Sequence, residues 1–117
     1  MAKYESRLSG DFGEFLSILE NGILKGSASA SLEDGSDYVS QGVRCAVRVY
    51  ERYSIIGSNR VSLSVTLIGT GSELFVSAIT AGGSQAVFFK INTLGEESFL
   101  QRAVDIIEDY KNRRNGR

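Results

Sequence analysis

Residues 42–53 read GVRCAVRVYERY, and their side chains alternate with the period of two that is typical of a β-strand. One set is apolar and is predicted to face the core: Val43, Cys45, Val47 and Val49. The other set is predicted to face away from the core: Arg44, Ala46, Arg48, Tyr50 and Arg52. This strand therefore anchors the predicted sheet and assigns its two faces.

Three further strand patterns follow this stretch, separated by turns that contain glycine. They are VSLSVTL, ELFVSAIT and AVFFKI, at residues 61–67, 73–80 and 86–91. Hydroxyl side chains alternate in the first of them with an apolar set that is also predicted to face the core: Val61, Leu63, Val65 and Leu67. Because consecutive strands joined by short turns pair with each other, the pattern predicts an antiparallel meander.

The strand signals before residue 42 are weaker. Residues 3–8 are predicted to form a short strand, and residues 28–32 form a weak strand of small alternating side chains. Residues 34–42 contain the dipeptide Asp-Gly and end in glycine, so they are predicted to form a turn or loop.

Two segments carry the single apolar stripe of an amphipathic helix. The first opens on Asp11 as its cap, and Gly22 is predicted to end it, so it covers about residues 11–20. The second opens near Thr93 and continues for about 16 to 18 residues. We expect residues 113–117 to be disordered.

The predicted element order is β-α-β-β-β-β-β-α. Helices with one apolar stripe each must bury it against a sheet, and both do so here against the same face. The sequence therefore predicts a single α+β domain over residues 1–117. It has two layers, with one antiparallel sheet of five to six strands and two helices on one face.

This order resembles the helix-grip and TATA-binding-protein-like architectures, in which a curved sheet holds a C-terminal helix. At a finer level, the runs GVRCAVRVYERYS, NRVSLSVTL and FVSAITAGGSQAVFFKINTLGEESFL are similar to a small bacterial family that has no assigned activity. The similarity extends from Tyr4 to about Tyr110. It implies a fold and supplies no catalytic motif.

Composition disfavours several classes of function. The chain has 117 residues, a formal net charge of −1, one cysteine and no histidine. Because the usual general base and metal ligand is missing, we expect a protein that is not an enzyme and holds no metal or cofactor. No apolar run is long enough for a membrane span or a secretory signal, so we expect a cytoplasmic protein without membrane contact. Cys45 has no second cysteine to form an intrachain disulfide.

The sheet face opposite the predicted core carries arginine and aromatic side chains, which are enriched at protein interfaces. We therefore expect a binding domain that self-associates as a homo-oligomer or binds an unidentified protein partner. The slightly negative net charge disfavours nucleic acid as the partner. The face is predicted to contain Arg44, Arg48, Tyr50, Arg52, Phe75, Ile79 and Phe88.

An alternative function is the binding of a small apolar ligand in a cavity between the sheet and the C-terminal helix. A filled core is the default for a domain of this size, which argues against such a cavity. Its predicted lining is Val47, Val49, Leu63, Val65, Phe89, Phe99, Ala103 and Ile107. The sequence leaves both functions open.

Overall fold

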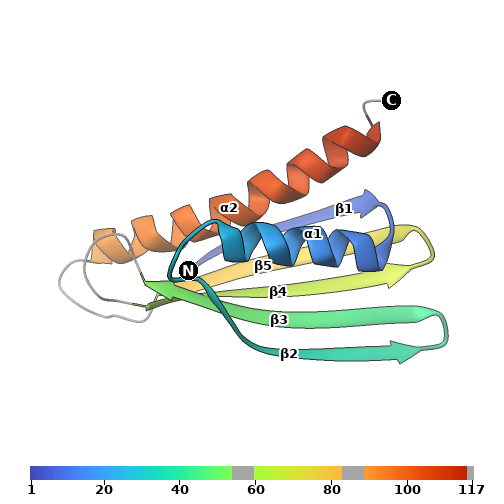
Figure 1. Ribbon diagram of the computed structural model, residues 1–117, viewed down its shortest axis with the longest axis horizontal. Coiled ribbons are helices and arrows are strands. Elements are labelled where there is room, and N and C mark those ends of the chain that lie inside the picture. The colour runs from blue at the N-terminus through green and yellow to red at the C-terminus, as the bar shows by residue number, and fades with distance from the viewer. Residues whose placement is uncertain (54–59, 83–88, 116–117) are drawn as a thin grey trace.

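The structure is a computed structural model, and it describes residues 1–53, 60–82 and 89–115, with only the backbone described for residues 89–96. Five strands and two helices follow each other along the chain (Figure 1). They are β1 (Ala2–Ser9), α1 (Phe12–Lys25), β2 (Ser31–Ser40), β3 (Val43–Tyr53), β4 (Arg60–Thr70), β5 (Glu73–Gly82) and α2 (Phe89–Asn115).

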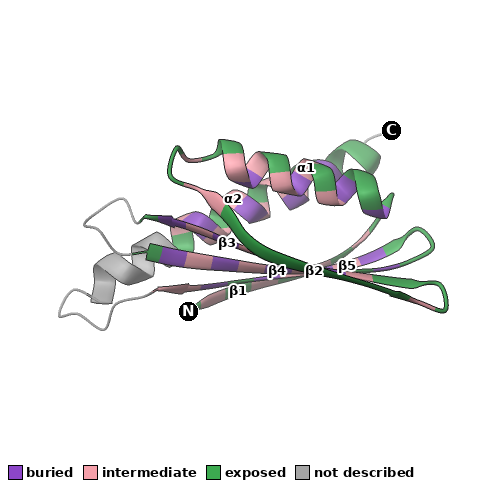
Figure 2. Ribbon diagram, turned by 60° about the horizontal axis from the view of Figure 1, so that its bottom comes forward, coloured by how far each residue is buried: buried purple, intermediate pink, exposed green. Residues whose placement is uncertain are grey.

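The strands form one open antiparallel sheet in the order β1-β5-β4-β3-β2. Strands β2 to β5 form an antiparallel meander, in which β3, β4 and β5 were predicted, and β1 pairs with β5 at the far side of it. Both helices lie over the same face of the sheet (Figure 2). The predicted α+β class is therefore confirmed, with five strands and two helices.

The core lies between the sheet and the two helices. Helix α2 packs against β1, β5 and β4, and it also contacts α1. Strand β4 has the predicted orientation, since its apolar set is buried: Val61, Leu63, Val65 and Leu67. The helices contribute Phe12, Phe15, Leu19, Ile23, Phe99, Ala103, Ile107 and Tyr110. Neither helix, over its described residues, has the length and apolar character needed to span a bilayer.

Helix α1 begins as predicted and ends later than predicted. The Asp11 carboxylate caps it by accepting a hydrogen bond of 2.8 Å from the Glu14 N–H. The helix continues to Lys25, so the predicted end at Gly22 is wrong. A Cβ at Gly22 would lie 2.5 Å from the Cδ1 of Ile106 in α2. The glycine therefore permits the close approach of two helices, and it does not end the first one.

Helix α2 extends beyond its predicted limits in both directions. It begins at Phe89, so the strand predicted at 86–91 is wrong over 89–91, while 86–88 lie outside the described residues. A short apolar run is compatible with either a strand or a helix, and here residues 89–91 of the run are helical. The predicted disorder is wrong over residues 113–115, which are helical.

Strand β2 occupies most of the segment that was predicted as a loop. Its backbone pairs with β3 from Ser40 to Ser31, with one irregularity between Leu32 and Asp34. The strand predicted at 28–32 is thus displaced toward the C-terminus. Neither helix covers β2, and its side chains are exposed along almost its whole length (Figure 2). Pairing with β3 overrides the local turn preference of this segment.

Candidate interaction face

Strand β3 has the orientation opposite to the prediction. Its register with β4 places Tyr50 directly opposite Leu63, which is buried under the helices. Residues opposite each other in neighbouring strands share a face of the sheet. The covered face therefore carries Arg44, Ala46, Arg48, Tyr50 and Arg52, and the uncovered face carries Val43, Cys45, Val47 and Val49. The predicted faces of both sets of β3 side chains are therefore wrong.

The three arginines of β3 are accommodated in different ways on the covered face. The guanidinium of Arg44 lies 4.2 Å from the ring centre of Phe12 in α1. Arg48 forms an ion pair of 3.0 Å with Asp37 of β2. Arg52 is buried near α2, and its surroundings are described below. Long arginine side chains can thus pack their aliphatic stems beneath a helix layer while their charges find separate partners.

Tyr50 lies in the interior of the covered face. It is fully buried, and its hydroxyl donates a hydrogen bond of 3.4 Å to the Glu20 carboxylate of α1. Burial, and secondly the charge of Glu20, raises the pKa of the Tyr50 hydroxyl, which is therefore neutral at physiological pH. A tyrosine ring fills the space between sheet and helices more fully than a valine, which gives a physical reason for the orientation of β3.

We call the uncovered side of the sheet the open face. Among the described residues, eight large apolar side chains are exposed, and five of them lie on the open face: Tyr38, Val43, Tyr53, Ile68 and Ile79. Half-buried apolar side chains lie between them: Cys45, Val47, Val49 and Phe75. Exposed apolar surface is thus concentrated on the face that the helices leave bare.

The strand register arranges the open face in rows that cross all five strands. The central row consists of Tyr38, Cys45, Ile68, Phe75 and Arg7, in order from β2 to β1. A second row, which we call the charged row, consists of Asp34, Val49, Ser64, Ile79 and Lys3 in the same order. The charged row therefore has an acid at the β2 edge and a base at the β1 edge.

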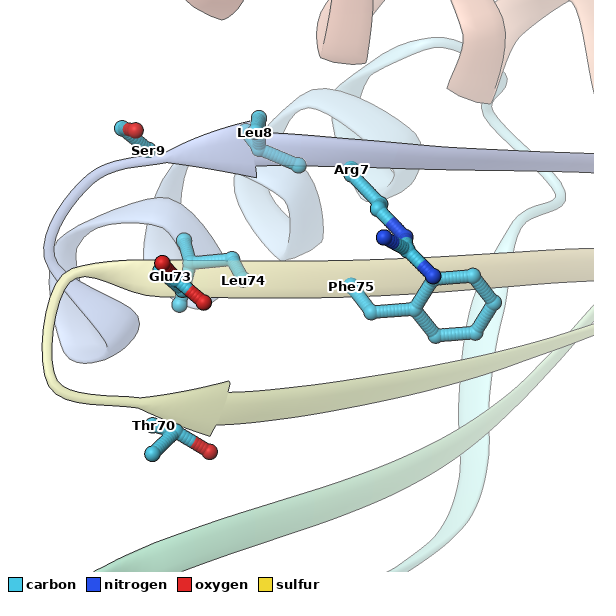
Figure 3. Close-up of a pocket in the computed structure, with 7 residues that line it drawn as sticks. All are labelled: Arg7, Leu8, Ser9, Thr70, Glu73, Leu74 and Phe75. Atoms are coloured by element: carbon cyan, nitrogen blue, oxygen red, sulfur yellow. The ribbon is translucent and has the colours of Figure 1, made fainter.

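A groove of about 630 Å³ lies at the β1 end of the central row (Figure 3). The Arg7 side chain extends toward the Phe75 ring, and Glu73 lies further along the same strand as Phe75 (Figure 3). The complete lining is Arg7, Leu8, Ser9, Thr70, Glu73, Leu74 and Phe75. The groove thus offers a cation, an anion and an aromatic ring to an approaching side chain.

The predicted interaction residues separate into two groups. Phe75 and Ile79 lie on the open face, as the prediction required. Phe88 lies outside the described residues. The remaining four lie on the covered face and are not available to a partner of the open face: Arg44, Arg48, Tyr50 and Arg52.

The predicted cavity lining is also divided by the orientation of β3. Val47 and Val49 lie on the open face, so their prediction is wrong. The side chain of Phe89 lies outside the described part of the chain. The other five residues are packed in the core with at most 1% of their surface exposed: Leu63, Val65, Phe99, Ala103 and Ile107.

Sequence reasoning missed the two ends of the central row. Tyr38 was assigned to a loop, and Arg7 belongs to a strand whose partner was not predicted. The alternation of β1 gives a weak signal for Arg7, because Tyr4 and Leu8 share the opposite face. Tyr38 carries no comparable local signal, since its neighbours in β2 are mostly polar on both faces.

The described residues contain no cluster of metal-ligating side chains. No three of their cysteine and carboxylate side chains come together as a ligand group for a metal ion. Cys45 is half-buried in the central row, between Tyr38 and Ile68.

Comparison with known proteins gives a family for the chain. The model of a family described as a family of unknown function (DUF6054) matches residues 1–111. This range includes all five strands, the whole of α1 and most of α2. No curated protein matches the chain.

Proposed function

We propose, for a chain that belongs to the family of unknown function DUF6054, that it is an interaction module that pairs with a second copy of itself through the open face. The observation that supports this proposal is the location of five of the eight exposed large apolar side chains on that face. Five strands of about ten residues give a face of roughly 800 Å². A stable interface buries about 800 Å² on each partner, so the face has a suitable size.

The open face is complementary to itself about a two-fold axis parallel to the central strand β4. Such an axis places β4 over β4, β3 over β5 and β2 over β1 of the second copy. Each row of one copy then lies over the same row of the other copy, with the order of the strands reversed. Sheets that pack face to face keep their strands within about 30° of each other, so the rows stay close to this register.

The first contact expected from this arrangement is an insertion of Tyr38. This side chain is 69% exposed at the β2 end of the central row. The two-fold axis brings it over the groove beside Arg7 and Phe75 of the other copy. A tyrosine can pack against the aromatic ring and the guanidinium there, and both contacts are favourable for an interface anchor.

The second expected contact joins the ends of the charged rows. Asp34 of one copy lies near Lys3 of the other, and the symmetry produces this pair twice. Pairs at the rim of an interface contribute little affinity, but they favour one register over others. The pairing therefore selects the two-fold arrangement that also places Tyr38 over the groove.

We assign this association to the cytoplasm and assign no catalysis to the protein. In that compartment Cys45 remains a thiol. The two-fold axis places it near Phe75 of the second copy, where a sulfur–aromatic contact is favourable.

Sedimentation equilibrium over a concentration series tests the proposal. Tyr38 and Val39 provide a matched pair, because they are adjacent in β2, are 69% and 64% exposed, and point to opposite faces. We expect the wild-type protein to form a dimer and Tyr38→Ala to raise its Kd at least about tenfold. Val39→Ala should leave the Kd unchanged. A protein that stays monomeric throughout, or equal effects of the two variants, would exclude the proposal.

A charge exchange tests the register of the two copies. Asp34→Lys and Lys3→Asp should each raise the dimer Kd about two- to fivefold, because each places like charges opposite each other. The double variant restores the pairing with its charges exchanged, so its Kd should return close to the wild-type value. Additive weakening in the double variant would argue for a different arrangement of the two copies.

A further inference from the structure

Arg52 is the single charged side chain that is buried within the described part of the chain. It lies on the covered face near the end of β3, opposite Val61 of β4, and 8% of its surface is exposed. The other two arginines of this face differ from it. Arg44 is exposed, and Arg48 has Asp37 as a partner. Among the arginines of β3, Arg52 is therefore the one that is buried with no acid beside it in the described part of the chain.

The described groups that contact the Arg52 guanidinium are neutral. Its Nη2 donates a hydrogen bond of 2.9 Å to the Oγ of Ser98 in α2. Its central carbon lies 4.5 Å from the ring centre of Phe99, the next residue of that helix. The Nε atom is buried and has no hydrogen-bond partner among the residues that the structure describes. Burial lowers the pKa of the Arg52 side chain, since the charged form loses water there.

We propose that Arg52 and Ser98 form a binding site for a small oxyanion, either a carboxylate or a phosphate. A buried charge is costly unless it is paired, and an oxyanion supplies both the missing charge and the missing acceptor. One of its oxygens accepts a hydrogen bond from Nε. Ser98 accepts from Nη2, and its own O–H can donate to a second oxygen of the anion. The planar guanidinium suits both anions.

The packing around Arg52 limits the size of the ligand. Tyr50 and Val61 on the sheet and Phe99 on the helix are buried to within 1% of their surface. Two grooves that described residues line lie at the opposite end of the sheet, beside Ser9. Because this packing leaves little room, the proposed ligand is a free anion or the anionic end of a larger molecule, and inorganic phosphate and acetate are the simplest probes.

Thermal unfolding in the presence of each probe tests the site. Sodium phosphate and sodium acetate are compared with sodium chloride at equal ionic strength. We expect a saturable rise of about 5 °C in Tm with at least one anion, once it exceeds its Kd about tenfold. The rise should disappear in Arg52→Gln and shrink in Ser98→Ala. It should persist in Arg44→Gln, which removes an exposed arginine of the same strand.

A measurement on the wild-type chain keeps the proposal testable if Arg52→Gln does not fold. The Arg52 Nε–H resonance in NMR spectra should shift with added phosphate or acetate and should not shift with chloride. An unchanged resonance, a Tm that follows ionic strength alone, or an undiminished rise in Arg52→Gln would each overturn the proposal. Arg52 lies on the covered face, so these outcomes do not depend on the proposed dimer.

Discussion

The covered face and the open face of the sheet are built from the same five strands, but they are packed differently. On the covered face, Leu67 and its neighbours Ala46 and Val76 are almost completely buried. One residue further along β4, Ile68 on the open face is 38% exposed. The open face also alternates apolar side chains with hydroxyls such as Thr66. The covered face therefore holds the fold together, while the open face can change without unfolding the protein.

The largest difference between the faces is expected from an added charge. Val65→Asp places a carboxylate in the core, at a cost of several kcal/mol that is comparable to the whole stability of a small domain. Thr66→Asp, on the adjacent open-face position, should change the free energy of unfolding by about 1 kcal/mol or less. Circular dichroism and urea denaturation compare the two variants. Similar losses in both would show that the open face is also part of the folding core.

Removal of apolar volume gives a smaller contrast on the same strand. Leu67→Ala should lower the free energy of unfolding by about 2 to 5 kcal/mol, because it leaves a cavity in the packed core. Ile68→Ala removes a side chain that already contacts water, so we expect about 1 kcal/mol or less. Urea titrations at a concentration that favours the monomer measure both. A larger loss for Ile68→Ala would reverse the assignment of the faces.

The layer that covers the sheet depends on the close contact between α1 and α2. Gly22→Leu introduces a side chain where Ile106 already lies, and it should cost about 1 to 3 kcal/mol by overpacking. Adding Ile106→Ala makes room for the leucine and should recover part of this loss. Denaturant midpoints of the single and double variants provide the test. No recovery in the double variant would argue against direct contact at this position.

The smallest effect is expected at the rim of the covered face, where β1 meets α2. The Tyr4 hydroxyl donates to the Glu108 carboxylate and, with Lys111, holds its pKa below the usual range. This stabilises the folded protein at a pH above the ordinary carboxyl pKa, which applies to the unfolded chain. The stabilisation is lost as the pH falls through the lowered pKa of Glu108 in the folded protein. Glu108→Gln should therefore reduce the loss of stability in acid slightly, below a pH of about 4.3. An unchanged acid profile, measured by urea midpoints, would contradict this role.

The sequence predicted the architecture correctly where a local pattern was compatible with only one orientation of the strand. In β4, apolar residues alternate with small hydroxyl residues, so Leu63 and Val65 could face only the core. In β3 both sets contain groups that can be buried, since arginine stems and a tyrosine ring pack as well as valines do. The alternation was correct, but its direction depended on the register with β4, which no local pattern contains.

The candidate site was predictable only in part for the same reason. The direction of the side-chain alternation was predicted correctly for β5, so Phe75 and Ile79 lie on the open face as predicted. Tyr38 was missed because β2 is a strand through its pairing with β3, and its own residues favour a turn. The burial of Arg52 was also missed, because a charged residue is expected outside unless a specific tertiary setting holds it.

The position of β1 has a consequence for synthesis of the chain. Ala2 pairs with Thr80, so β1 leaves the ribosome well before β5, the strand with which it pairs. At about 5 to 20 residues per second, this interval lasts roughly 4 to 16 s. During that time the apolar side chains of Tyr4 and Leu8 have no sheet to join, whereas the hairpin of β3 and β4 can already form. We therefore expect a chaperone that binds short apolar segments to contact β1 during this interval.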